Sequence, residues 1–274
     1  MDLTKNIVFC DASYFVFYRY YAIKGWYKRA KELDIDVENI LNDEEFIGKY
    51  DSTFEKLIMD ISRKYNVPYK NIVFAKDCTR ERIWRTKLFP DYKACRDEKI
   101  TSFNGDIFKH TYYNLFPRLQ KKYNFIDILH NNLEADDVIA LFVKYIRNID
   151  QKCKIVVITN DNDYVQLYKY NIEIYNLQAK SLRDRIEDVD NYLEYKIIVG
   201  DKSDNIKSIG KKIGDKTAKK MLENEELYTK ILQQPNVKET YILNKTLIDF
   251  DCIPSDYKKE VEMMYSDILK PGIV

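Results

Sequence analysis

The sequence predicts an α/β protein with a mostly parallel, twisted sheet flanked by helices, and two observations carry that prediction. Short apolar segments typical of buried strands recur as far as Tyr175, and amphipathic helical segments lie between several of them. Strands that alternate with helices favour a parallel, doubly wound sheet. A chain of 274 residues, 45% hydrophobic and 32% charged, is large enough to bury the core of such a domain.

The elements follow from local patterns along the chain. Five segments are expected to be strands: 5–10, 71–75, 126–129, 154–159 and 172–175. Four are expected to be helical: 13–27, 51–65, 107–124 and 133–146. The first of these helices is dense in aromatic residues, which predicts a buried face, with a base-stacking surface as the alternative. Residues 80–99 are basic and aromatic, without a clear core periodicity.

The pattern becomes helical from about residue 190. The chain has only 7 glycines, yet Gly200, Gly210 and Gly214 lie close together, which indicates a local need for unusual backbone. A helix is expected over 216–222. The last 50 or so residues are expected to form helices over the core, broken at Pro235 and Pro254.

Several classes of protein are excluded by composition. No run of 18 apolar residues exists, and the N-terminus is too short and mixed for a signal peptide, so an intracellular, cytoplasmic protein is expected. The five cysteines are far apart and form no C-x-x-C pair, which argues against zinc or a disulfide framework. With two histidines only, carboxylates or lysines must carry any catalysis. The net charge of +1 taken alone argues against a strongly basic nucleic-acid binder.

Seven carboxylates are expected to converge at one edge of the sheet. Asp11, Asp77 and Asp161 each follow a predicted strand, at the edge where open parallel sheets usually place their binding and catalytic sites. The others are Glu134, Asp136 and Asp137 at a helix start, and Asp163. Any one alone is more simply a loop or helix cap. Together they would repel one another without a hard cation, and all-oxygen ligation selects Mg²⁺ or Mn²⁺. Two ions would suit phosphodiester hydrolysis.

Four motifs, in order along the chain, resemble the 5′→3′ exonuclease and flap endonuclease family on its bacterial and phage side. They are the arch motif at 89–96, the acidic helix motif at 133–140, the strand-end Asp pair at 159–167, and the opening of the helix–three-turn–helix at 199–218. The resemblance covers residues 5 to about 225. It implies a PIN-like nuclease core over 1–190, with a helical arch at about 80–120. It also implies that 191–274 form the helix–three-turn–helix and a C-terminal helical region packed with the core.

The resemblance implies roles for particular residues. It assigns nine carboxylates to two divalent ions: Asp11, Asp77, Glu134, Asp136 and Asp137 for the first, and Asp161, Asp163, Asp201 and Asp204 for the second. It makes Lys93 and Arg96 catalytic at the base of the arch, with Tyr92 beside them as a DNA-binding residue. A point charge and a bidentate fork would both suit a dianionic transition state. A solvated basic loop is the alternative for these three residues.

Further basic residues are expected to contact DNA. Arg80, Arg82, Arg85 and Lys87 would line the path of a single strand. Duplex phosphates would lie against the Gly-rich turn, through Gly210, Lys211, Lys212, Gly214, Lys216 and Thr217. The resemblance also implies a monovalent cation (K⁺) at this turn, but the segment Ser208-Ile-Gly-Lys-Lys-Ile-Gly214 departs from the family's Gly-Val-x-Gly-Ile-Gly pattern.

The expected function is that of a structure-specific, Mg²⁺-dependent DNA 5′ nuclease in replication or repair. Its partner would be branched or nicked DNA with a 5′ flap, and the chain is expected to act as a monomer, without a sliding-clamp peptide or a polymerase domain. A PIN-like ribonuclease and a non-catalytic junction-binding protein on the same fold stay open as alternatives. The arch and hairpin motifs argue against the first, and the complete carboxylate set argues against the second.

Overall fold

The computed structural model describes residues 1–31, 39–95 and 103–269. In this part of the chain, five parallel strands form one sheet in the order β3-β2-β1-β4-β5. The strands are β1 (Ile7–Asp11), β2 (Ile72–Lys76), β3 (Ile126–Leu129), β4 (Ile155–Ile158) and β5 (Glu173–Tyr175). Val8 is in register with Ile72 of β2 and Val156 of β4, so β1 lies at the centre. The predicted α/β class and all five predicted strands are therefore confirmed.

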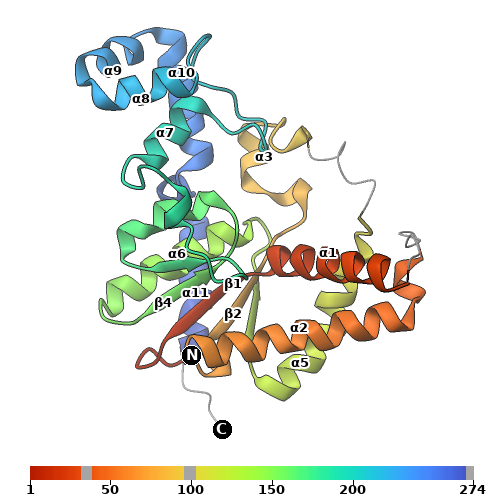
Figure 1. Cartoon of the computed structure of the whole chain (residues 1–274). Coiled ribbons are helices and arrows are strands. Elements are labelled where there is room, and N and C mark those ends of the chain that lie inside the picture. Colours follow the sequence, from red (N-terminus) through yellow and green to blue (C-terminus); the bar gives the residue numbers. More distant parts are fainter. Residues whose placement is uncertain (32–38, 96–102, 270–274) are drawn as a thin grey trace.

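Helices occupy most of the remaining described chain (Figure 1). They are α1 (Ala12–Lys31), α2 (Glu44–Lys64), α3 (Trp84–Leu88), α4 (Asp106–Lys109), α5 (Phe116–Tyr123), α6 (Ala135–Ile149), α7 (Tyr192–Val199), α8 (Asp215–Glu223), α9 (Glu225–Leu232), α10 (Pro235–Ile248) and α11 (Ser255–Leu269). A π-helical segment, His110–Leu115, joins α4 to α5. The two predicted breaks are seen as helix starts, because Pro235 opens α10 and Pro254 directly precedes α11.

Side-chain alternation along the strands gives the sheet two buried faces. Ile7 and Phe9 of β1 pack with α6 and α11, whereas Val8 and Cys10 pack with α1, α2 and α5 (Figure 1). The aromatic residues of α1 contribute to the second core through Phe15 and Tyr20, as the buried-face interpretation predicts. None of the helices in the described residues is long and apolar enough to cross a membrane.

The segment expected to form a helical arch divides into two parts. Phe103, Ile107, Phe116 and Leu119 are buried in the same core as α1 and α2, so the later part packs onto the sheet. The earlier part, residues 80–95, crosses the carboxyl edge of the sheet and packs against α7 and α10 through Tyr92, Ile197 and Leu247. Residues 96–102, including Arg96, lie outside the described residues.

The strand order creates a crevice at the carboxyl edge of the sheet. The chain leaves β1 towards β2 on one side, and later returns to add β4 on the other side of β1. Neighbouring connections therefore diverge between β1 and β4, and such switch points are where open parallel sheets hold their ligands. Asp11 ends β1 and Asp161 closely follows β4, so both carboxylates lie at this switch point.

Candidate active site

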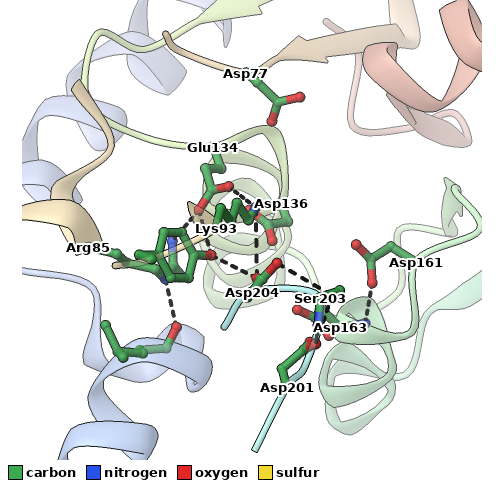
Figure 2. A network of polar contacts seen from close by, with 12 residues as sticks. Asp77, Arg85, Lys93, Glu134, Asp136, Asp161, Asp163, Asp201, Ser203 and Asp204 are labelled. Carbon is green, nitrogen blue, oxygen red and sulfur yellow. Dashed lines mark hydrogen bonds and ion pairs between the residues drawn. The ribbon is translucent and has the colours of Figure 1, made fainter. Parts of the chain in front are cut away.

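A cleft of about 860 Å³ lies over the switch point and is lined mainly by polar side chains. Seven of the nine expected carboxylates line it: Asp11, Asp77, Glu134, Asp136, Asp161, Asp163 and Asp201. The other two, Asp137 and Asp204, are buried just behind its wall. These residues come from the ends of three strands, from the start of α6 and from the loop after α7. Figure 2 labels all of them except Asp11 and Asp137.

Asp11 and Asp77 are held by local hydrogen bonds at the ends of β1 and β2. Asp11 accepts hydrogen bonds from the Tyr14 N–H at 3.1 Å and the Thr159 hydroxyl at 3.2 Å. Asp77 accepts one from the Ala135 N–H at 2.8 Å and another from Ser13. Burial, together with the nearby Asp77 carboxylate, raises the pKa of Asp11 to about 7. This cost of bringing negative charges together is what a bound cation would remove.

The first turn of α6 presents three acidic residues. Glu134 is the N-cap residue, and its backbone N–H donates a hydrogen bond to the Asp137 carboxylate at 3.3 Å. Asp136 lies between them along the chain and faces the cleft. A helix N-terminus favours negative charge, which explains why the sequence can place acids here. Burial and the neighbouring Asp137 and Glu134 carboxylates still raise the pKa of Asp136 well above its usual range.

Asp137 belongs to an internal ion pair. Its side chain is 0% exposed and accepts two hydrogen bonds of 2.7 Å from Arg85, one to each carboxylate oxygen. The indole N–H of Trp84 donates to it at 3.0 Å. Arg85 is 2% exposed and also donates to Glu134 and to the backbone oxygen of Leu247. Arg85 therefore does not offer its guanidinium to a passing strand, because its donors are used inside the protein.

Tyr92 and Lys93 link the first group of carboxylates to Asp204. The Tyr92 hydroxyl lies 3.0 Å from both a Glu134 oxygen and an Asp204 oxygen. Tyr92 is 3% exposed, so its ring is not available for the DNA contact that the resemblance implies. The Lys93 ammonium contacts Glu134 and lies 3.8 Å from Asp204 (Figure 2). Lys93 has a φ of 59°, a left-handed conformation unusual for lysine, and its N–H donates to the Asp204 carbonyl at 3.0 Å.

A second group of carboxylates lies on the other side of the cleft. Oxygens of Asp163, Asp201 and Asp204 can all lie within 4.8 Å of one another. Asp201 accepts two hydrogen bonds of 2.7 Å from Ser203, through its N–H and its hydroxyl. Gly200 permits this turn: its φ is +76°, and a Cβ there would lie 2.4 Å from the Ile206 carbonyl oxygen. Of the three clustered glycines, Gly200 is therefore explained by the backbone conformation and the close contact that this turn requires.

Lys196, which the sequence did not single out, pairs with two members of this second group. Its ammonium pairs with Asp163 and lies 2.8 Å from Asp201. Although burial acts in the opposite direction, Lys196 and the hydrogen bonds from Ser203 lower the pKa of Asp201 to about 2. Asp161, by contrast, sits at the rim, where its side chain caps the following turn by accepting from the Asp163 N–H at 2.9 Å. Burial raises the pKa of Asp161, and Lys196 and Lys93 oppose that shift.

The remaining basic residues that precede the arch motif, Arg80, Arg82 and Lys87, do not all lie at the cleft. Arg80 lines the cleft and donates to the backbone oxygen of Lys93 at 2.7 Å. Arg82 is exposed outside the cleft lining, and Lys87 extends towards the hydroxyl of Tyr257 at 3.3 Å. The structure therefore brings only part of the expected basic lining to the carboxylates.

The Gly-rich turn directly precedes α8 (Figure 1), whose first residue, Asp215, also lines the cleft. Lys211, Lys212 and Lys216 are exposed there. The turn is supported by Ile209, which is buried with Ala218, Met221 and Val237 of the neighbouring helices. Thr217 donates back to the Lys212 carbonyl at 3.3 Å, and Lys212 has a φ of 66°. The turn thus projects lysines and a helix N-terminus outward from a small hydrophobic core.

The donor set fits hard divalent cations. Two groups of carboxylates can each place oxygens within 4.8 Å of one another: Glu134 with Asp136 and Asp137, and Asp163 with Asp201 and Asp204. Neither group includes histidine or cysteine, and oxygen-only sites favour Mg²⁺ or Mn²⁺ over zinc. Within the first group, Asp137 is saturated by Arg85 and Trp84, which leaves Glu134 and Asp136 as the donors that face the cleft.

Comparison with known proteins gives the class of the chain. The sequence model of the 5′-3′ exonuclease N-terminal resolvase-like domain matches residues 6–196. The chain therefore belongs to the 5′-3′ exonuclease and flap endonuclease family of nucleases, as the motifs predicted. The match includes the arch motif, the acidic helix and Lys196, and ends before Asp201.

Individual relatives agree with this assignment. The chain is 24% identical to the ribonuclease H of Enterobacteria phage T4 over 232 residues, which cover 77% of this chain and 75% of that protein. It is 29% identical to a 5′-3′ exonuclease of Mycoplasmopsis pulmonis, over 66% of this chain and 59% of that protein. A solved bacteriophage T5 flap endonuclease, in a complex with DNA and metal ions, has a TM-score of 0.65 at 19% identity, covering 97% of this chain and 98% of that one.

Proposed function

We propose that this chain is a structure-specific 5′ nuclease that hydrolyses phosphodiester bonds of branched or nicked DNA in replication or repair. The observation that carries the proposal is the convergence of seven carboxylates on one cleft, with Lys93 and Arg80 in its wall. Family membership supports the nuclease class, and the T5 relative was crystallised with DNA and metal ions. Flap endonuclease and 5′→3′ exonuclease activity on a substrate with a 5′ single strand follow from the same proposal.

Two divalent ions would be held by the two carboxylate groups. Asp11, Asp77, Glu134 and Asp136 would serve the first, and Asp161, Asp163, Asp201 and Asp204 the second, some of them through water. When bound, such ions activate an attacking water and stabilise the leaving oxygen. Asp137 is assigned a positioning role, because its oxygens are occupied by Arg85 and Trp84. The ions are proposed to be Mg²⁺, with Mn²⁺ as a substitute.

Lys93 is proposed to stabilise the reacting phosphate. Its ammonium contacts Glu134 at the edge of the cleft. Its left-handed backbone conformation and the hydrogen bond from its N–H to the Asp204 carbonyl fix the position of the Lys93 backbone. A positive charge placed beforehand next to the developing negative charge lowers the barrier without reorganisation. Arg96, outside the described residues, is proposed to act beside it.

The duplex is proposed to lie across residues 191–274, which would form one unit with the core at 1–190. Gly210, Gly214 and the N-terminus of α8 would approach duplex phosphates, and Lys211, Lys212 and Lys216 would neutralise them. The packing of Ile197 and Leu247 against Tyr92 connects this unit to the catalytic edge. A potassium ion at the turn stays part of the proposal, and a single chain is proposed to be sufficient.

The choice between DNA and RNA is tested by matched substrates. Single-turnover cleavage of 5′-flap, nicked, gapped and hairpin-blocked DNA, and of the same flap made of RNA, should be compared in Mg²⁺. The proposal expects cuts near the junction of the DNA flap that leave a 5′-phosphate. Preferred cleavage of the RNA flap would favour a PIN-like ribonuclease. Junction binding without cleavage of any substrate would favour a non-catalytic binding protein.

A further inference from the structure

Lys196 occupies an unusual position for a lysine. It lies in the last turn of α7, and its side chain is only 12% exposed. Its ammonium pairs with Asp163 from the turn after β4 and with Asp201 from the loop after α7, at 2.8 Å from the latter. Three segments of the chain are thus joined at one positive charge.

The same two carboxylates belong to the second metal-binding group. Asp163 and Asp201, with Asp204, can place their oxygens within 4.8 Å of one another. A divalent ion held by these oxygens would lie only a few ångströms from the Lys196 ammonium. Two positive charges at this separation repel one another, so an ion binds these carboxylates less favourably while the lysine is paired with them.

The first group is arranged differently. Hydrogen bonds to Asp11 and Asp77 come from backbone N–H groups and from the hydroxyls of Thr159 and Ser13. Two cations lie near this group: Lys93 pairs with Glu134, and Arg85 pairs with Glu134 and Asp137. Among the described residues, neither forms an ion pair with Asp11, Asp77 or Asp136. Neutral donors hold Asp11 and Asp77 in place without adding a positive charge that would compete with a metal ion.

We propose that Lys196 competes with the second divalent ion for Asp163 and Asp201, so that the second ion binds more weakly than the first and after it. This inference rests on the proposed two-ion function. In the metal-free protein the lysine relieves repulsion among the three carboxylates. When the ion binds, the ammonium is released into the cleft, where a substrate phosphate can pair with it. Substrate and second ion therefore favour one another's binding, because each takes one partner of the broken ion pair.

The competition is tested by binding of Mn²⁺ alone, measured by the decrease in the electron paramagnetic resonance signal of the free ion. The wild-type protein is expected to show a tight and a weak site. Lys196→Met should tighten the weak site by roughly tenfold or more, because even at the dielectric constant of water one charge about 5 Å from a dication has an effect of this size. Lys202→Met is the matched control. Lys202 also lines the cleft but is exposed, so its loss should leave the affinity of both Mn²⁺ sites unchanged.

Adding Asp201→Asn assigns the site. In the wild-type background, Asp201→Asn should abolish the weak Mn²⁺ site. In the Lys196→Met background, it should remove the increase in affinity that Lys196→Met produces. If Asp201→Asn leaves Mn²⁺ binding unchanged, the two-ion function itself is wrong. If it removes the weak site but Lys196→Met does not tighten that site, only the competition is wrong. Lys196→Gln, neutral but able to donate a hydrogen bond, gives the same comparison if Lys196→Met does not fold without metal.

Discussion

Arg85 and Asp137 form a buried bidentate ion pair beneath the cleft, with both hydrogen bonds at 2.7 Å. The pair connects the segment after β2 to the first turn of α6, and Arg85 extends the connection to the backbone of α10 through Leu247. Two adjacent acids, Asp136 and Asp137, therefore have different surroundings: the first lines the cleft and the second is held by Arg85.

This difference predicts opposite effects of Asn at the two positions on stability. Asp137→Asn removes the bidentate partner of the buried Arg85 charge, which keeps only its single contact with Glu134, and should lower the free energy of unfolding by about 3–5 kcal/mol. Asp136→Asn removes a carboxylate that its neighbours repel, and should leave stability unchanged or raise it. Urea unfolding in the presence of a chelator measures both. Equal destabilisation by the two variants would contradict the separate roles.

Tyr92→Phe tests whether the hydroxyl of Tyr92 positions carboxylates. The change removes the contacts to Glu134 and Asp204 and keeps the buried ring, so the fold should persist. Losing hydrogen bonds to charged groups should reduce the single-turnover rate by about tenfold. Flap affinity measured in Ca²⁺ should not change, because the ring does not reach the DNA. A loss of affinity at an unchanged rate would instead support the DNA contact that the resemblance implies for Tyr92.

Lys93→Ala tests the proposed electrostatic role. The single-turnover rate should fall by about 10²–10³, the range seen when one preorganised donor is removed from a charge-stabilising site. Affinity for a 5′-flap substrate should fall much less, since most phosphate contacts would be made elsewhere. Lys87→Ala, which removes a lysine directed away from the cleft, is the control. Equal losses of rate and affinity in Lys93→Ala would reduce its role to binding.

Divalent ions should stabilise the folded protein without any substrate. At Mg²⁺ concentrations about 100 times the dissociation constant, one site adds about 2.7 kcal/mol to the free energy of unfolding. The Tm should therefore rise when Mg²⁺ is added and fall back to its metal-free value when a chelator is added. Asp11→Asn should reduce this rise in Tm. A Tm that does not respond to Mg²⁺ would mean that the carboxylates do not hold ions in the free protein.

The parts of the site that the sequence predicts are those fixed by local pattern. Asp11, Asp77 and Asp161 follow apolar strands, and the acids of α6 start an amphipathic helix, so a parallel sheet brings them to one edge. The positions of Arg85 and Lys196 depend on contacts with residues far along the chain. Arg85 lies in a basic run that looks exposed, and its burial requires Asp137, 52 residues away. Lys196 pairs with Asp163, 33 residues before it, and with Asp201, only five residues after it, and the latter contact depends on the turn of the loop that follows α7.

The most direct test of the account is cleavage and binding of one 5′-flap DNA by Asp136→Asn and Asp161→Asn. Each variant removes a carboxylate of the cleft and no proposed phosphate contact. We predict that in Mg²⁺ neither variant cleaves the flap under single-turnover conditions, while both bind it in Ca²⁺ with wild-type affinity. Full cleavage by either variant would contradict the assignment of the active site.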